Sequence, residues 1–428
     1  MKISYLLTGN ELMSGDTIDS NSSILSQSLR DIGLMPFKKV VVGDDFELLV
    51  ATMRTLIKES DVMIVNGGLG PTRDDLTAQA LAQAINQPIE RHPQALAWLE
   101  QWASSRGFVV TESNLKQADL PLACNIIDNP VGSAVGFSSV SDDCLVLCTP
   151  GVPSELKLMV KEQLLPLIKE QAGISESSDI SRLRLFGITE SGLQDIIDAK
   201  FPNWPADVEL GFRVQMPVIE LKVRTIGEAN RHLNSQWSDN LRSLFADYII
   251  GDNDTRLSQA LNQALSDSGK KLVTAESCTG GAIAAAISSE AGASSVFVGG
   301  FTTYSNSMKQ SVLGVSQATI EQQGAVSETV VLEMLQGALG NSDADIALAI
   351  SGIAGPTGGS PGKPIGTVWI AWGGLQKQIA RRFYLPMNRQ AFQRTATAIA
   401  MDLLRRELNG LPTDVDYFAE LRRKYAKQ

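Results

Sequence analysis

Histidine and cysteine are scarce in this sequence of 428 residues, which holds two histidines and four cysteines. His92 and His232 stand neither in a glycine-rich turn nor at the end of an apolar run, so a serine–histidine–aspartate triad is not expected. The cysteines, at positions 124, 144, 148 and 278, lack the spacing of zinc ligands. Alternation along a strand places Cys144 and Cys148 on one face, and we expect all four thiols to be reduced, as in a cytoplasmic protein.

Long apolar runs and an excess of positive charge are also missing. No run approaches the ~18 apolar residues of a membrane-spanning helix, and the first residues turn polar too early for a secretory signal. The chain has 37 basic and 47 acidic residues, a formal net charge of −10, which argues against a nucleic-acid partner. We therefore expect a cytoplasmic protein with neither a membrane nor a nucleic-acid partner.

The length suggests about three domains. We expect an α/β domain at residues 1–171, a small α+β connecting domain at 172–251, and a second α/β domain at 252–428. Residues 172–182 are predicted to form a linker, because small and polar residues dominate there. The connecting part holds no cluster of potential catalytic groups, and we interpret it as a spacer or dimerisation element.

The first domain alternates predicted strands and helices. Asp19 is a candidate helix N-cap and Gly33 a helix stop. The expected strands are 3–7, 37–42 and 62–65, and the expected helices are 20–32, 47–58 and one from residue 76. The strand at 62–65 enters the glycine-rich run 66–75 (NGGLGPTRDD), whose backbone N–H groups could approach a phosphate closely. Asp74 and Asp75 then offer carboxylates to a divalent metal ion, although a plain helix-capping turn is the alternative.

In the third domain, a β-branched run at 272–276 ends abruptly at Ser277 and gives way to a predicted helix at 282–287. A turn of this kind exposes its residues at the carboxyl edge of a sheet, where the free N–H groups of the helix's first turn favour negative charge. Ser277 is thus a candidate nucleophile. Lys309, after a second strand-like run at 296–304, is the candidate base once burial removes its charge. Spacing alone leaves a capping serine and a surface lysine as the alternative.

Further elements of the third domain complete a sheet with helices. The expected helices are 257–268, 317–323, 328–339 and one from residue 389; the expected strands are 344–350, 366–372 and 378–385. The loop 351–359 follows an apolar strand of the parallel type, so it is predicted to lie beside the Ser277 turn.

Five motifs occur in order across this domain: 275–281 (AESCTGG), 303–306 (TYSN) with Lys309, 324–328 (GAVSE), 351–356 (SGIAGP) with 358–359 (GG), and 363–369 (KPIGTVW). This set resembles the CinA C-terminal, or PncC, family. The resemblance implies a three-layer α/β fold that hydrolyses the carboxamide of nicotinamide mononucleotide to nicotinate mononucleotide and ammonia, without a cofactor.

The resemblance also implies roles for individual residues. Ser277 would attack, Lys309 would take its proton, and Tyr304 would either orient Lys309 or stack on the pyridine ring. The remaining candidates, for the oxyanion and the substrate, are Thr279, Gly280, Gly281, Ser351, Gly352, Gly355 and Arg389, with Arg394 as an alternative to Arg389 for the phosphate. Met387 and Asn388 stand where the family has glycine and aspartate.

The first domain carries a second set of motifs: 9–11 (GNE) with Gly15, 19–21 (DSN), 42–45 (VGDD), 67–72 (GGLGPT) with Asp74 and Asp75, 129–132 (NPVG), and 150–155 (PGVPSE). They resemble the CinA N-terminal domain, which is related to the three-layer molybdopterin-binding fold. The resemblance implies a metal-dependent pyrophosphatase that splits ADP-ribose into AMP and ribose 5-phosphate. The implied metal ligands are Asp44, Asp74 and Asp75, and the implied phosphate-binding residues are Asn21, Gly67, Gly68, Gly70 and Thr72. Asn66 replaces the usual threonine, and Lys116 is either a basic contact or an exposed helix residue.

Three hypotheses follow from the sequence. The first is a bifunctional, homodimeric enzyme that recycles pyridine nucleotides through these two hydrolytic reactions. The second is a molybdopterin-binding or adenylylating protein. The third is a competence-associated partner protein whose catalysis has decayed.

Overall fold

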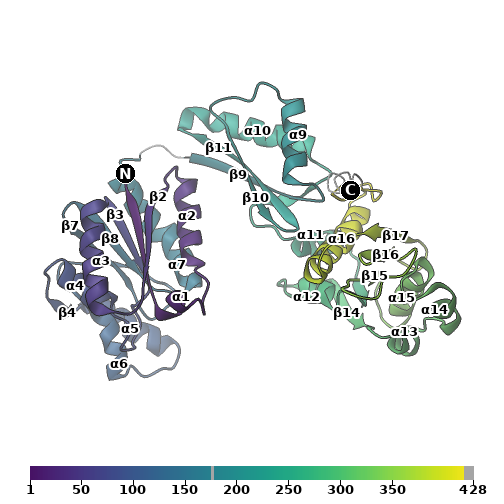
Figure 1. Cartoon of the computed structure of the whole chain (residues 1–428), viewed down its shortest axis with the longest axis horizontal. Helices are drawn as coiled ribbons and strands as arrows, with labels where there is room; N and C mark the ends of the chain where they lie inside the picture. The colour runs from purple at the N-terminus through teal and green to yellow at the C-terminus, as the bar shows by residue number, and fades with distance from the viewer. Residues whose placement is uncertain (175–177, 419–428) are drawn as a thin grey trace. The chain divides into compact units, whose positions relative to one another are not determined.

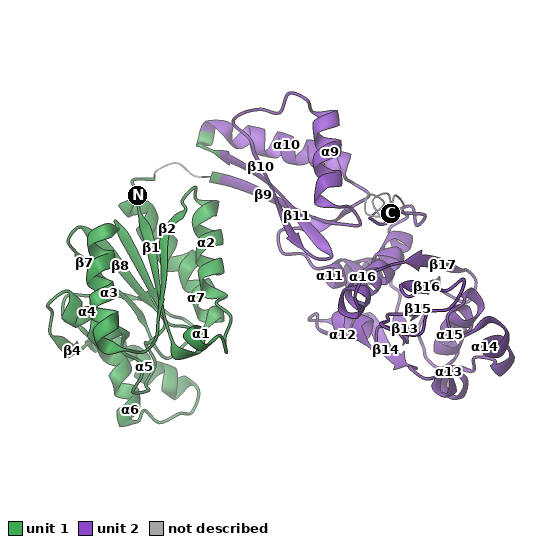
Figure 2. Ribbon diagram, in the orientation of Figure 1, with its two compact units in different colours: residues 1–178, 226–228 green, residues 179–225, 229–428 purple. Residues whose placement is uncertain are grey.

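The computed structural model describes residues 1–174 and 178–418, which form two compact units (Figures 1 and 2). Unit 1 holds the described residues up to 178 together with 226–228, and unit 2 holds 179–225 and the described residues from 229 onward. Unit 2 contains two separate sheets, each with its own apolar core. The division into three domains therefore stays a prediction.

Unit 1 is built on a six-stranded sheet in the order β2-β1-β3-β8-β7-β6. Its strands are β1 (Ile3–Thr8), β2 (Pro36–Val42), β3 (Val62–Asn66), β6 (Asn125–Ile127), β7 (Gly136–Ser141) and β8 (Cys144–Thr149). The first four strands in the sheet order are parallel to one another. β7 pairs antiparallel with β8, and β6 pairs antiparallel with β7. Two short strands, β4 (Ile89–Arg91) and β5 (Asp119–Pro121), pair apart from this sheet.

Helices cover both faces of this sheet, because alternate residues of its strands are apolar on both sides. One face packs on α3 (Phe46–Glu59), α4 (Thr77–Ala84) and α5 (Pro93–Ser105). The other packs on α2 (Asn21–Asp31), α7 (Pro153–Met159) and α8 (Leu165–Gln171). Two short helices, α1 (Asn10–Ser14) and α6 (Glu112–Leu115), lie outside these layers. The predicted three-layer fold is confirmed, and Cys144 and Cys148 share one buried face as free thiols.

The connecting part of the chain is a four-stranded sheet, β10-β11-β9-β12, with two helices. Its elements are β9 (Ser178–Phe186), α9 (Glu190–Lys200), β10 (Glu209–Gln215), β11 (Val218–Ile226), α10 (Arg231–Leu244) and β12 (Ile249–Asp252). The predicted linker 172–182 is too long, since 178–182 already belong to β9; residues 175–177 lie outside the described residues. Polar residues misled the prediction because Asn234 of α10 bonds Ser181 and the Asp179 carbonyl.

The C-terminal part of unit 2 contains a five-stranded sheet in the order β14-β13-β15-β16-β17. Its strands are β13 (Leu272–Glu276), β14 (Phe297–Thr302), β15 (Ile346–Gly352), β16 (Thr367–Gly373) and β17 (Gln378–Tyr384). β14, β13 and β15 are parallel to one another. β16 pairs antiparallel with β15, and β17 pairs antiparallel with β16. The carboxyl ends of the three parallel strands therefore meet at one edge.

Five helices sandwich this sheet, and a sixth, α14 (Gln317–Gln323), packs on α15. The first face packs on α11 (Leu257–Ser268), α12 (Ala282–Ser288) and α16 (Arg389–Leu408). The second face packs on α13 (Asn306–Leu313) and α15 (Glu328–Gly340). The predicted three-layer α/β class of this part is confirmed.

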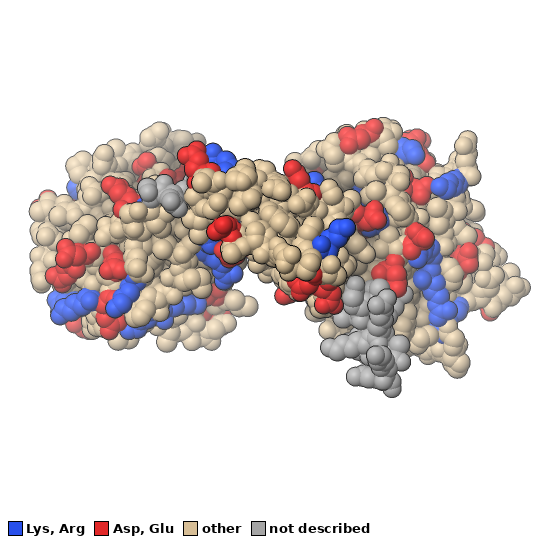
Figure 3. All heavy atoms as spheres, turned by 90° about the horizontal axis from the view of Figure 1, so that it is seen from above, with Lys and Arg blue, Asp and Glu red and all other residues tan. Residues whose placement is uncertain are grey.

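Acidic and basic side chains are intermingled on the face of the molecule that Figure 3 shows. Among the described residues, no helix combines the length and the apolar character that crossing a membrane requires.

Candidate functional site

Ser277 lies directly after β13, at the carboxyl edge of the C-terminal sheet. Its backbone N–H donates to the Ile350 carbonyl at 3.1 Å, which ties the turn to the end of the neighbouring strand β15. The loop after β15 therefore lies alongside this turn, as parallel strand order requires. The side chain of Ser277 is only 8% exposed.

Lys309 reaches Ser277 from α13, on the second face of the sheet. Its Nζ lies 2.9 Å from Ser277 Oγ and 2.8 Å and 3.3 Å from the carbonyls of Thr303 and Tyr304. Ser305 caps α13 by accepting the Met308 N–H. Lys309 is 1% exposed, and within the described chain none of its hydrogen-bond partners is a carboxylate. Burial disfavours the ammonium form and lowers the pKa of Lys309 from 10.5 to about 8.

The N–H groups at the start of α12 donate to a side chain of the protein itself, contrary to the expectation that they face the substrate. The buried Glu276 carboxylate accepts the N–H groups of Ile283 at 3.0 Å and Ala284 at 2.8 Å, and the Thr279 hydroxyl at 2.7 Å. The Gly280 N–H donates to the Ser277 carbonyl. Sequence reasoning missed Glu276, and a carboxylate at the end of an apolar strand was its only signal.

The backbone donors available for an oxyanion differ from the predicted set. Within the described residues, the N–H groups of Cys278, Thr279 and Gly281 have no hydrogen-bond acceptor, whereas that of Gly280 has one. Two of the three predicted donors, Thr279 and Gly281, thus remain available, and Cys278 joins them. Burial raises the pKa of the Cys278 thiol to about 12, so this cysteine is not a competing nucleophile.

Tyr304 and Arg389 form one rim of the site. Arg389 donates to the Tyr304 hydroxyl at 2.8 Å and to the Gly355 carbonyl at 3.1 Å. The Tyr304 carbonyl contacts Lys309, whereas the phenol reaches Arg389, so the ring does not orient the lysine. Tyr304 is 59% exposed, so its ring is accessible to a ligand.

Ser351 and Gly352, two other predicted substrate residues, contact backbone groups of neighbouring segments. The Ser351 hydroxyl donates to the Ala325 carbonyl at 2.7 Å, and a Cβ on Gly352 would lie 3.0 Å from the Thr367 carbonyl. Asn388 accepts the Ala391 N–H and caps α16. Asparagine and aspartate cap helices about equally well. Asn388 in place of the family's aspartate therefore still caps the start of α16. Arg394 lines a different cavity, on the first face of the sheet.

The glycine-rich turn of unit 1 opens onto a cavity of about 560 Å³. Of the predicted residues, the cavity is lined by Asp44, Gly67, Gly68, Gly70, Asp74 and Asp75. Gly67 and Gly68 have positive φ angles of 106° and 67°, and a Cβ on Gly67 would lie 2.7 Å from the Thr8 carbonyl. Glycine is required there because the backbone approaches so closely.

The three aspartates lie on this cavity without forming one compact cluster. Asp44 accepts the Thr8 hydroxyl and the Asn10 N–H. The Thr72 hydroxyl lies within hydrogen-bond distance of both Asp74 and Asp75, and the Thr72 N–H also donates to Asp75 at 2.8 Å. The hydrogen bond from the Thr72 hydroxyl lowers the pKa of Asp74. In the described chain, no three His, Cys, Asp or Glu side chains lie close enough together to hold a metal ion. Paired carboxylates still fit an ion such as Mg²⁺, which takes its other ligands from water and phosphate.

Asn21, which was predicted to bind phosphate, has another role together with Asn66. Asn21 donates to the Asn66 side chain at 2.8 Å and to the Gly151 carbonyl at 2.7 Å, and Asn66 donates to the Pro150 carbonyl. Both amides are buried and hold the loops together instead of lining the cavity. Lys116 donates to the Thr72 carbonyl and so braces the glycine-rich turn. Ser133 and Glu155 also line the cavity. Sequence reasoning missed Ser133, and it placed Glu155 in a motif without giving it a role.

Comparisons with known proteins cover both halves of the chain. The model of the CinA C-terminal domain matches residues 254–408, and that of a probable molybdopterin binding domain matches residues 4–170. A CinA-like protein of Colwellia psychrerythraea is 45% identical over 422 residues, which cover 98% of each chain. A CinA-like protein of Shewanella woodyi is 41% identical over 97% of this chain and 98% of its own.

Among solved structures, a competence-damaged protein (CinA) superfamily protein of Klebsiella pneumoniae is 40% identical. The match covers 36% of this chain and 96% of that one, with a TM-score of 0.35. The near full-length relatives decide the assignment. This chain belongs to the CinA-like protein family.

Proposed function

We propose that the C-terminal part of the chain hydrolyses the carboxamide of nicotinamide mononucleotide, giving nicotinate mononucleotide and ammonia. The observation that supports this most is the 2.9 Å contact between Lys309 Nζ and Ser277 Oγ in a buried setting. A serine nucleophile needs a base, and a desolvated lysine can serve as one near neutral pH.

The reaction follows from this contact. Neutral Lys309 takes the proton of Ser277 Oγ as the oxygen attacks the carboxamide carbon. The N–H groups of Cys278, Thr279 and Gly281 would hold the oxygen that gains negative charge. The tetrahedral intermediate expels ammonia, which takes its proton from Lys309. Water then attacks the acyl-enzyme with Lys309 again as base, and nicotinate mononucleotide is released.

Substitution of the pair tests this proposal. Ser277→Ala and Lys309→Ala should each lower ammonia release from nicotinamide mononucleotide by at least about 10²-fold. Ser288→Ala, which changes an exposed serine on α12, is the matched control and should retain the activity. Ammonia release from Ser277→Ala at the wild-type rate would remove the proposal.

For unit 1, we propose metal-dependent hydrolysis of ADP-ribose to AMP and ribose 5-phosphate. The glycine-rich turn and three aspartates on one cavity support it. Asp74 and Asp75, with Asp44 nearby, would hold a divalent ion, whose chemistry is to neutralise phosphate charge. The turn's backbone would bind the pyrophosphate, and Thr72 fixes both neighbouring carboxylates.

The test separates this reaction from the molybdopterin alternative. Full-length protein should hydrolyse ADP-ribose, lose that activity with EDTA or in Asp75→Asn, and keep it in Ser277→Ala. Molybdopterin adenylylation without ADP-ribose hydrolysis would favour the alternative. Failure of both domains to turn over any of these substrates would favour the non-catalytic partner protein.

A further inference from the structure

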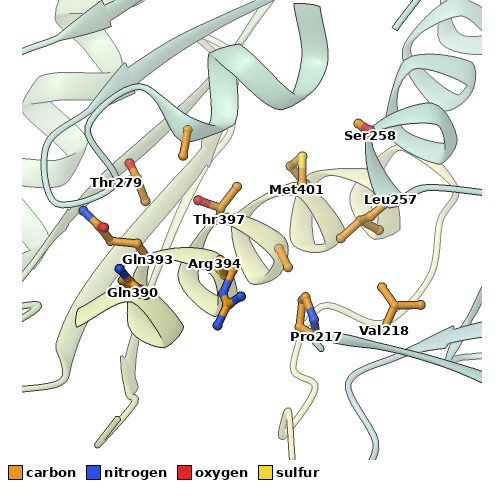
Figure 4. A pocket seen from close by; sticks show the side chains of 12 residues that line it. Pro217, Val218, Leu257, Ser258, Thr279, Gln390, Gln393, Arg394, Thr397 and Met401 are labelled. Carbon is orange, nitrogen blue, oxygen red and sulfur yellow. The ribbon is translucent and has the colours of Figure 1, made fainter. Parts of the chain in front are cut away.

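A cavity of about 550 Å³ lies in unit 2, between α11, α12, α16 and the start of β11 (Figure 4). It is separate from the catalytic pair. Neither Ser277 nor Lys309 lines it, and Lys309 comes from α13, on the opposite face of the sheet. Its size falls in the range of small-molecule sites.

Two polar groups in this cavity lack partners. Thr397 is 7% exposed, and its hydroxyl has no hydrogen bond among the described residues. The Arg394 side chain, one helical turn before it, is exposed to solvent and makes no hydrogen bond or ion pair within the described chain. A buried hydroxyl without a partner is costly, so a ligand that bonds Thr397 would offset a deficit built into the site.

The cavity favours an anion with an apolar body. Arg394 is the one charged residue among the described lining residues, although the chain as a whole has a net charge of −10. Figure 4 shows the amides of Gln390 and Gln393 at one end and the side chains of Leu257 and Val218 at the other. A flat, largely apolar group with one phosphate matches this arrangement.

We propose that the cavity binds a nucleoside monophosphate, with its phosphate on Arg394, and that the bound nucleotide activates the neighbouring catalytic turn. The connection is direct. Gln393 Nε2 donates to the Cys278 carbonyl at 2.9 Å, and Thr279 lines the cavity while its hydroxyl bonds Glu276. A ligand against Gln393 and Thr279 restrains the peptide groups whose N–H groups would hold the oxyanion. This activating effect rests on the proposed amide hydrolysis, whereas the binding does not.

Binding is tested with AMP and the full-length protein. A crystal soak should show AMP beside Arg394, and calorimetry should show this site weakened at least about tenfold in Arg394→Gln and Thr397→Val. Arg30→Gln, which changes an exposed arginine of unit 1, is the control and should retain the affinity. Adenosine, which lacks the phosphate, should also bind at least about tenfold more weakly. AMP found only in the glycine-rich cavity of unit 1, or unaltered binding by Arg394→Gln, would overturn the proposal.

Coupling is tested by ammonia release from nicotinamide mononucleotide. Saturating AMP should raise kcat/KM by about fivefold in wild type, and Gln393→Leu should abolish this rise while the folded protein still binds AMP. An unchanged rate with the cavity occupied would overturn the activating role. Absence of any ammonia release from wild type would instead remove the proposed amide hydrolysis and leave the AMP-binding result standing.

Discussion

Glu276 and Ser277 are consecutive in the chain, yet their side chains act on opposite sides of the strand end. The Glu276 carboxylate bonds the first turn of α12 on the first face. Ser277 Oγ meets Lys309 from the second face. This follows from the alternation of side chains along a strand. The residue that fixes the turn and the residue that would react are therefore separable by mutation.

Glu276→Gln should destabilise the protein by about 1–3 kcal/mol, because it replaces charge-assisted hydrogen bonds to two N–H groups at a helix start. Urea unfolding measures this change, and ammonia release should fall as the turn shifts. Glu328→Gln is the control, since Glu328 also lies in the first turn of a helix but is exposed. Equal losses in the two variants would contradict the special role of Glu276.

Ammonia release should depend on pH through Lys309. Its pKa lies at about 8, and the neutral form is the base, so about one molecule in ten is competent at pH 7. The value of kcat/KM should rise about tenfold per unit at lower pH and level off above pH 8. A profile between pH 6.5 and 9.5 checks this expectation, and a level profile through pH 7 would argue against the lysine as base.

Two glycines of α15 should respond differently to alanine. A Cβ on Gly337 would lie 1.9 Å from the Leu313 carbonyl at the end of α13, whereas Gly340 has no atom within 4 Å of its added Cβ. Gly337→Ala should cost about 1–3 kcal/mol by overpacking and should displace the helix that carries Lys309. Gly340→Ala should be neutral or stabilise by up to about 1 kcal/mol.

Thermal unfolding and ammonia release measure both glycine variants. If Gly337→Ala matched Gly340→Ala in stability and activity, the tight contact between α13 and α15 would not matter for positioning the lysine.

Asp402 anchors a buried ion network on α16. Its carboxylate accepts Arg405 at 2.7 Å, Arg406 at 2.7 Å and the Tyr417 hydroxyl at 2.7 Å. Asp402→Asn should cost about 3–5 kcal/mol, because it leaves two buried guanidinium groups without a counter-charge.

The control for Asp402 is Glu407→Gln, which breaks a partly exposed pair with Lys377. That change should cost less than about 1 kcal/mol. Urea unfolding measures the free energy of unfolding of both variants. A similar loss in the two would contradict the prediction that the buried network around Asp402 stabilises the protein more than the exposed pair does.

The order of elements could be predicted from apolar periodicity and turn residues. Helix α11 and helix α14 have the predicted bounds, and the other elements that were predicted differ mainly at their ends, whereas α13, the helix that carries Lys309, was not predicted. The linker prediction was wrong at 178–182, because the polar residues of β9 find partners on α10, which comes about fifty residues later. No local pattern carries that information.

The candidate site likewise has features that the sequence determined and features that only the tertiary structure decided. The sequence alone determined which residue types stand at the strand ends, because a β-branched run that stops at Glu276 and Ser277 must turn there. Only the tertiary structure decided which groups meet: Lys309 is 32 positions from Ser277, and burial in the fold shifts its pKa. The occupied first turn of α12 and the separate position of Arg394 were likewise decided by packing, since hydrogen-bond partners are set by distance in space and not by spacing along the chain.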